Sequence, residues 1–144
     1  MMIVPDVNLL IYAYNQAAPH HARARAWWED LLSAEQPVAI PWAVVFGFVR
    51  LVTHPRVLER PIRPATALDH VEAWLARPAV QILEPGARHL TVCRALLAAT
   101  GVAAGLTTDT HLAALAIEHQ CELHSNDPDF ARFPGLRWRN PLTR

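Results

Sequence analysis

Hydrophobic and polar positions alternate along this chain in blocks of two lengths. The short apolar runs predict buried strands, and the longer, mostly amphipathic runs predict helices. The expected strands are Met2–Val4, Gln36–Ile40, Val80–Leu83, one within Gly105–Phe130, and Gly135–Trp138. The expected helices are Leu9–Tyr14, His20–Ser33, Trp42–Thr53, Ala65–Ala76, Gly86–Thr100 and one that begins near Asp109. Strands that alternate with helices predict an α/β fold, in which a mainly parallel sheet is covered on both faces.

The apolar positions also predict which side of each helix faces the core. In the helix His20–Ser33 the apolar stripe is formed by Ala22, Ala26, Trp27 and Leu31. In the helix Ala65–Ala76 it is formed by Leu68, Val71 and Leu75. The helix Trp42–Thr53 is apolar on all sides, which indicates a core or interface helix. Arg50 in such a helix requires a partner, either a carboxylate of the same chain or a phosphate.

Length and composition favour a compact protein. The chain has 144 residues, of which 52% are hydrophobic, and we expect one domain spanning residues 1–144. No apolar run approaches the ~20 residues of a membrane span, and the N-terminus lacks the pattern of a secretory signal. We therefore expect a cytoplasmic protein that does not enter a membrane. Cys93 and Cys121 have no metal-ligand spacing and are interpreted as small buried side chains.

The charged residues exclude several chemistries. The formal net charge is zero, and all 13 basic residues are arginines. Without lysine, Schiff-base enzymes, P-loop proteins and phosphoaspartyl enzymes that use a lysine are excluded. The loop His54–Pro64 carries the one basic cluster, Arg56, Arg60 and Arg63, for which solvated surface charge and an RNA or partner contact remain equally open.

Three aspartates follow the predicted strands or begin a helix. Asp6 and Asp127 come after strands, and Asp109 stands at a helix start. In a parallel sheet these positions meet at the carboxyl edge, where α/β folds bind ligands. Carboxylates brought together repel one another unless a cation binds them. A ligand set of oxygen atoms suits Mg²⁺, with Mn²⁺ as an alternative, and is typical of metal-assisted phosphodiester hydrolysis.

The sequence resembles the PIN domain family, and within it the VapC-type ribonuclease toxins of type II toxin–antitoxin systems. The matching segments are DVNLLIYA, PWAVVFGFVRLVTHPRV and TTDTHLAALAIEHQCELHSNDPDFARFPGLRW. The resemblance implies a PIN-like three-layer α/β/α sandwich. It also implies an endoribonuclease that cleaves RNA with a Mg²⁺-activated water, and a cognate antitoxin protein as partner.

The resemblance also implies roles for individual residues. Asp6, Asp109 and Asp127 correspond to catalytic, metal-binding carboxylates. Supporting positions are Asn8 and Ser125 beside them, and Asp129 in the loop. Arg50 is a candidate contact for RNA phosphate.

One position departs from the family pattern. Gly47 stands three residues before Arg50, where the family usually has a glutamate. Glu118 does not replace that glutamate, because nine residues of helix after Asp109 turn it about 900° and carry it roughly 13 Å away. The missing carboxylate bears on metal affinity and on one versus two metal ions. It also keeps open an alternative function, a non-catalytic RNA- or protein-binding module.

The apolar residues also predict a protein interface. The helix Trp42–Thr53 and the pair Trp27–Trp28 exceed what one small core requires. Exposed apolar surface of this kind marks protein contacts. We therefore expect a homodimer and a groove for the antitoxin.

Overall fold

The computed structural model describes residues 1–143 of the chain. Its centre is a five-stranded sheet in the order β3-β2-β1-β4-β5, in which every pair of neighbouring strands is parallel. The strands are β1 (Ile3–Pro5), β2 (Val38–Pro41), β3 (Val80–Leu83), β4 (Glu122–His124) and β5 (Arg137–Arg139). The apolar runs at β1 and β2 are buried along their whole length, as expected for central strands of a parallel sheet.

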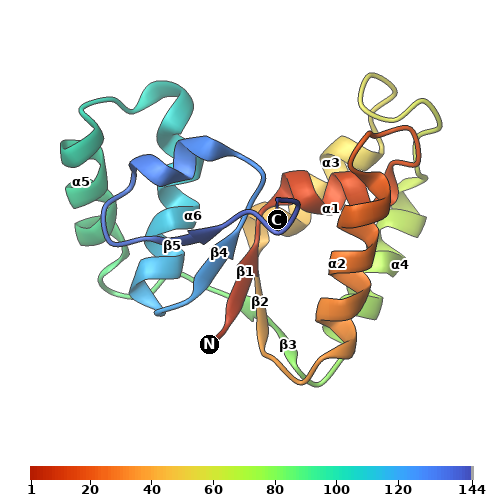
Figure 1. Ribbon diagram of the computed structural model, residues 1–144, viewed down its shortest axis with the longest axis horizontal. Coiled ribbons are helices and arrows are strands. Elements are labelled where there is room, and N and C mark those ends of the chain that lie inside the picture. The colour runs from red at the N-terminus through yellow and green to blue at the C-terminus, as the bar shows by residue number, and fades with distance from the viewer. Residues whose placement is uncertain (144) are drawn as a thin grey trace.

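Helices cover both faces of this sheet (Figure 1). On one side lie α1 (Val7–Tyr14), α2 (His21–Ser33), α3 (Trp42–Val52) and α4 (Pro64–Leu75). On the other side lie α5 (His89–Thr100) and α6 (Thr107–Glu118), with the short 3₁₀ turns η1 (Ala104–Leu106) and η2 (Pro128–Arg132). The predicted three-layer α/β/α architecture with a parallel sheet is confirmed.

The predicted elements all exist, and their bounds differ by a few residues. The largest difference is at α5, which begins at His89 and not at Gly86. The cause is a side chain from another helix: the Glu118 carboxylate accepts hydrogen bonds from the Gly86 and Arg88 N–H groups at 2.8 and 3.1 Å. Both N–H groups are therefore bound to the last residue of α6, and α5 begins after them, at His89.

Two predicted helix faces were only partly correct, with Leu31 and Val71 buried as predicted. In α2, Ala22 and Ala26 are exposed, and the buried positions are Ala24, Trp28 and Leu31. Two adjacent tryptophans leave the register of such a short stripe ambiguous, and the core accommodates Trp28. In α4, Leu68 is exposed, and Ala67, Val71 and Trp74 face inward.

The tryptophan pair is therefore not surplus apolar surface. Trp28 is 2% exposed and its ring meets that of Trp74 edge-on, with centroids 5.3 Å apart. Trp27 packs against Trp28 and donates its indole N–H to His124 Nδ1 at 3.0 Å. Both rings belong to the core or its margin, so this part of the interface prediction was wrong.

The helix α3 has two different sides. Val44, Val45, Phe48 and Val52 are buried, whereas Trp42 and Phe46 are 44% and 59% exposed and stack on each other. Arg50 is also exposed, and it makes no ion pair within residues 1–143. The predicted carboxylate partner of Arg50 is therefore absent from the described residues, and the contact with a phosphate stays a prediction.

Two further predictions concern the whole chain. None of the helices in residues 1–143 is long and apolar enough to cross a membrane. Cys93 and Cys121 are both free thiols, and Cys121 is buried while Cys93 is half-buried.

Candidate metal centre

The site forms where two neighbouring strands end. Strands β1 and β4 pair in register, with Pro5 opposite His124, so the residues that follow them emerge together at the carboxyl edge. The Asp6 N–H donates to the His124 carbonyl at 2.8 Å. Asp6 and Ser125, which are far apart in the sequence, are thereby placed side by side.

Asp6 is a buried carboxylate with two donors. Its Oδ1 accepts from the Val7 N–H at 2.7 Å, which caps α1, and its Oδ2 accepts from the Ser125 hydroxyl at 2.7 Å. The side chain is 6% exposed. The same carboxylate therefore caps α1 and accepts from Ser125 at the end of β4.

Ser125 connects this aspartate to the loop that follows β4. Its fully buried hydroxyl accepts from the Asp127 N–H at 3.0 Å and from Asn8 Nδ2 at 3.3 Å. Asn8 lies inside the first turn of α1 and donates to Ser125, and the cap of that helix is Asp6. Asn8 Oδ1 in turn accepts from the Asn126 N–H at 3.5 Å. Ser125 therefore connects the Asp6 side chain to the backbone of Asp127.

The closest carboxylate group consists of Asp109, Asp127 and Asp129. One oxygen from each lies within 4.8 Å of the others. Asp109 stands in the first turn of α6, and the Asp127 Oδ1 accepts from the Asp129 N–H at 2.9 Å, which turns the loop back toward α6. Asp6 is not a member of this group within residues 1–143. The structure thus brings Asp109 and Asp127 together as expected, and adds Asp129 where the sequence favoured Asp6.

The sequence analysis gave Asp129 a supporting role, whereas its carboxylate lies in the close group with Asp109 and Asp127. The signal that could have indicated it is the Asp-Pro-Asp spacing from Asp127 to Asp129. An aspartate whose side chain accepts from the N–H two residues later forms a tight turn. Such a turn carries the second carboxylate back over the first.

The electrostatics of the site match a group of uncompensated carboxylates. Burial, and after it the charges of Asp127, Asp6 and Asp129 in that order, together raise the pKa of Asp109 from its ordinary 3.8 to about 6. Burial also raises the pKa of Asp6, against the lowering effect of its Ser125 and Val7 hydrogen bonds. The charges of the other three aspartates therefore all raise the pKa of Asp109. Oxygens of Asp109, Asp127 and Asp129 lie within 4.8 Å of one another, and Asp6 is not part of that group.

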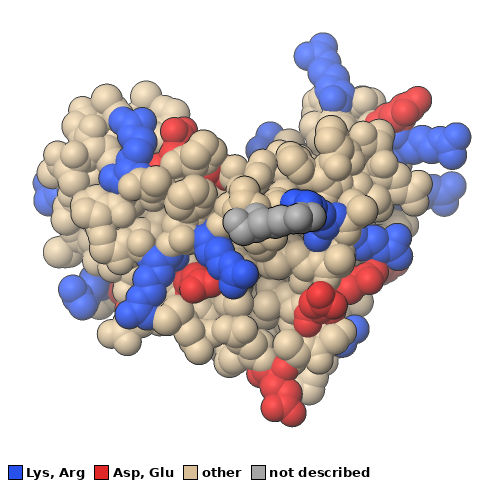
Figure 2. Space-filling view, viewed as in Figure 1, with Lys and Arg blue, Asp and Glu red and all other residues tan. Residues whose placement is uncertain are grey.

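The three grouped aspartates are not enclosed by the fold. Figure 2 shows a notch in the surface between the α5–α6 side and the α1–α4 side, with acidic side chains on the flank of the α5–α6 side. Asp109 and Asp127 are half-buried and Asp129 is exposed. Their oxygens can therefore be reached by a ligand from solvent.

Neither Gly47 nor Glu118 belongs to this group. A Cβ at Gly47 would lie 3.4 Å from Val7 Cγ2, so position 47 lies against the first residue of α1 and supplies no carboxylate. Glu118 is at the opposite end of α6 and holds the loop before α5.

The chemistry of the donor set fits a hard divalent cation. All the gathered side-chain ligands are carboxylate oxygens, and no nitrogen or sulfur ligand within residues 1–143 joins them. Such sets suit Mg²⁺ and Mn²⁺, which keep several water ligands when few carboxylates bind them. A bound cation would also offset the burial and the carboxylate repulsion that raise the pKa of Asp109.

Comparison with known proteins identifies the family. Residues 3–136 match the PIN domain. The chain belongs to the PIN domain family. Ribonuclease VapC33 of Mycobacterium tuberculosis is 45% identical over 141 residues, covering 98% of this chain and 99% of that protein. Ribonuclease VapC37 of the same species is 38% identical over 140 residues, covering 97% of each. The resemblance of this PIN domain to VapC-type toxins is confirmed.

Solved PIN-fold structures agree with this architecture. The crystal structure of VapBC2 from Rickettsia felis bound to promoter DNA superposes with a TM-score of 0.71 at 21% identity, covering 97% of this chain and 98% of that one. Mycobacterium tuberculosis VapC20, described as a toxin that cleaves the sarcin-ricin loop, gives a TM-score of 0.64 at 17% identity, covering 94% and 98%. At these identities the likeness shows the fold alone.

Proposed function

We propose that this PIN domain is a metal-dependent endoribonuclease, the toxin of a toxin–antitoxin pair. The single observation that carries the proposal is the group of three carboxylate oxygens from Asp109, Asp127 and Asp129 within 4.8 Å of one another at the carboxyl edge of the sheet. The full-length likeness to proteins named ribonucleases supplies the reaction class.

The chain's own residues provide a negatively charged binding site for a cation. Asp109, Asp127 and Asp129 would hold Mg²⁺ or Mn²⁺, with Asp6 as a fourth charge behind them. When bound, the ion neutralises phosphate charge and lowers the pKa of an attacking water. Ser125 and Asn8 keep the loop of Asp127 in place relative to Asp6. Their contribution is positional, because neither side chain belongs to the carboxylate group.

The RNA contact is proposed from exposed arginines. Arg50 is exposed and free of an ion pair within residues 1–143, and Arg56, Arg60 and Arg63 are also exposed on the loop between α3 and α4. Guanidinium groups bind phosphate through two parallel hydrogen bonds. A basic arm on the α3–α4 side of the notch would attract the RNA backbone that an acidic site alone repels.

Four single substitutions test the site. Asp6→Asn, Asp109→Asn, Asp127→Asn and Asp129→Asn are assayed for RNA cleavage and for Mg²⁺ binding by calorimetry. Loss of both properties in the Asp109, Asp127 and Asp129 variants, with a smaller loss of binding in the Asp6 variant, is the expected result. Undiminished cleavage by Asp127→Asn would contradict the assignment.

The alternative function, a non-catalytic binding module, is not favoured. It was suggested by Gly47 in place of a glutamate, yet the carboxylate group assembles without that residue. The two functions differ in a simple measurement. A resident cation raises the melting temperature as its concentration increases, whereas a module without a metal site gives no shift.

The proposed protein partners are an antitoxin and a second copy of the chain. The VapBC structures from Rickettsia felis and Salmonella typhimurium are complexes, and a cognate antitoxin is proposed here by analogy. A homodimer is proposed on the exposed, stacked rings of Trp42 and Phe46. Trp42→Ser with Phe46→Ser should then yield a monomer in light scattering, and a wild-type monomer at micromolar concentration would contradict the dimer.

A further inference from the structure

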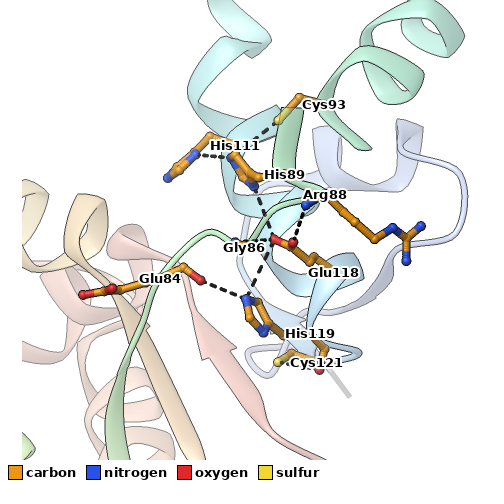
Figure 3. A network of polar contacts seen from close by, with 9 residues as sticks. All are labelled: Glu84, Gly86, Arg88, His89, Cys93, His111, Glu118, His119 and Cys121. Carbon is orange, nitrogen blue, oxygen red and sulfur yellow. Dashed lines mark hydrogen bonds and ion pairs between the residues drawn. The ribbon is translucent and has the colours of Figure 1, made fainter. Parts of the chain in front are cut away.

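Two loops of this protein are fixed by hydrogen bonds from segments that are distant in the sequence. The loop before α5 is bound to Glu118, within a network that contains none of the three grouped aspartates (Figure 3). The loop after β4 carries Asp127, and it is held by residues 138–142 as well as by Ser125 and Asn8. Only this second loop therefore bears on the candidate metal site.

The segment 138–142 contacts the loop at two points. The Trp138 indole N–H donates to the Ser125 carbonyl at 3.0 Å. Asn140 Nδ2 donates to Asn126 Oδ1 at 2.9 Å. The two acceptors belong to the residues directly before Asp127, so the segment fixes the part of the chain from which that carboxylate projects.

The orientation of both asparagine amides follows from one backbone group. The Leu142 N–H donates to Asn140 Oδ1 at 3.0 Å, so the other atom of that amide, Nδ2, is the one that faces Asn126. A donor at this point requires an acceptor, and Asn126 therefore presents its Oδ1. The Asn126 N–H in turn donates to Asn8 Oδ1 at 3.5 Å. Asn126 is thus held from α1 and from segment 138–142 at the same time.

The segment 138–142 is itself anchored to the rest of the fold. Leu142 is 5% exposed and belongs to the core, and its carbonyl accepts from Arg23 Nη1 of α2 at 2.8 Å. Trp138 packs against the same core from β5. Side chains hold a site accurately when packing and hydrogen bonds fix their own positions, and Asn140 lies between these two anchors.

We propose that Asn140 is a positioning residue of the metal site, which acts on Asp127 through Asn126. The inference rests on the proposed function, because it concerns the cation that Asp127 would bind together with Asp109 and Asp129. These carboxylates repel one another when no cation is present. A loop fixed at Asn126 resists that repulsion and keeps Asp127 close to the other two. Loss of a hydrogen bond that orients a metal ligand typically weakens metal binding about 10–100-fold.

The test compares Asn140→Ser with Asn15→Ser on the full chain. Serine is too short to reach Asn126, but it still accepts from the N–H two residues later, so the turn at Leu142 is kept. Asn15 is a matched control, because its Oδ1 accepts from the Ala17 N–H at 3.1 Å in the same kind of turn, at the end of α1. In calorimetry, Asn140→Ser should bind Mg²⁺ about tenfold more weakly than the wild type, and Asn15→Ser should bind it equally.

Action through Asn126 is tested by a double-mutant cycle. Asn126→Ala alone should weaken Mg²⁺ binding to a similar extent, and adding Asn140→Ser should weaken it no further. A higher Mg²⁺ concentration should restore RNA cleavage by Asn140→Ser, since its carboxylates are intact. Losses of affinity that add in the double variant, or cleavage that stays low at saturating Mg²⁺, would rule out the positioning role.

Amide hydrogen exchange of the metal-free protein separates this inference from the proposed function. In Asn140→Ser, the N–H groups of Asn126 and Asp127 should exchange about tenfold faster than in the wild type, and those of β2 should be unchanged. A wild type that neither binds Mg²⁺ nor cleaves RNA would contradict the proposed function. A wild type that does both, with Mg²⁺ affinity and exchange unchanged in Asn140→Ser, would overturn the role of Asn140 alone.

Discussion

The two ends of α6 carry carboxylates with opposite surroundings. At the first turn, Asp109 is half-buried among other carboxylates, and its pKa is raised to about 6. At the last residue, the Gly86 and Arg88 N–H groups donate to Glu118, and the Gly86 bond is the main reason that the Glu118 pKa is lowered. At the start of α6 several carboxylates lie close together and repel one another. At its end, two backbone N–H groups donate to the Glu118 carboxylate.

This difference separates a binding site from a structural contact. A carboxylate that destabilises the metal-free fold is explained if a cation stabilises the bound form. A carboxylate with two backbone donors needs no further ligand, and it fixes the loop before α5 to the end of α6. The acidic end is therefore the candidate for chemistry, although both ends contain acidic residues on one helix.

The largest expected effect is on catalysis. Asp109→Asn removes a proposed metal ligand, and RNA cleavage should fall about 100-fold or more, the equivalent of several kcal/mol. The same change removes repulsion, so the metal-free variant should melt at a higher temperature than the wild type near neutral pH. Single-turnover cleavage and melting with a chelator measure the two effects. Asp69→Asn, an exposed aspartate on α4, is the control and should change neither.

The next effect concerns the hydroxyl that supports the acidic end. Ser125→Ala leaves the buried Asp6 Oδ2 without its donor and the Asp127 N–H without its acceptor. The free energy of unfolding should fall by about 1–3 kcal/mol in urea denaturation. Ser33→Ala, an exposed serine at the end of α2, should change it little. Equal effects at the two serines would mean that the buried network does not stabilise the fold.

A smaller effect is expected at the compensated end. A Cβ at Gly86 would lie 2.5 Å from Glu118 Oε2, so Gly86→Ala must displace the carboxylate from its two donors. The expected loss of stability is about 1 kcal/mol. Gly105→Ala is the matched control, because a Cβ there meets nothing within 4 Å. A more stable Gly86→Ala variant would show that the Glu118 contact is dispensable.

The position that lacks the usual glutamate allows a gain of function. Gly47→Glu places a carboxylate on α3 beside the start of α1, and Mg²⁺ should bind roughly tenfold more tightly, about 1.4 kcal/mol, because another negative charge lies near the ion. Calorimetric titration measures the change. Gly47→Ala tests the cost of the Cβ alone against Val7. If both variants bind Mg²⁺ equally, position 47 does not reach the metal.

Stability measured as a function of pH should distinguish the two carboxylates. Because the folded-state pKa of Asp109 is raised from 3.8 to about 6, the metal-free protein should lose stability as pH rises through this range. Because the folded-state pKa of Glu118 is lowered below its ordinary 4.5, its contribution should be lost as pH falls below that value. Stability–pH curves of Asp109→Asn and Glu118→Gln should each lack one of these slopes. Curves that coincide with the wild type would contradict both assignments.

Much of the fold was predictable because it depends on local patterns. The apolar runs at β1 and β2 are buried as predicted, and the helices α3 and α4 begin within one residue of the expected positions. The buried faces of α2 and α4 were less predictable, because Trp28 of α2 and Trp74 of α4 pack against each other in the core. The sequence of one helix does not reveal a packing partner that lies on another helix.

The candidate site divides in the same way. Sequence order and residue type predicted that Asp6, Asp109 and Asp127 would meet at the carboxyl edge, because parallel strands of any α/β fold end there. Only the tertiary structure decided that Asp129 completes the close carboxylate group, and that Asp6 stands behind it, held by a serine 119 residues away. Distances of a few ångströms between such remote residues are set by strand register and loop turns, which depend on the whole packed chain.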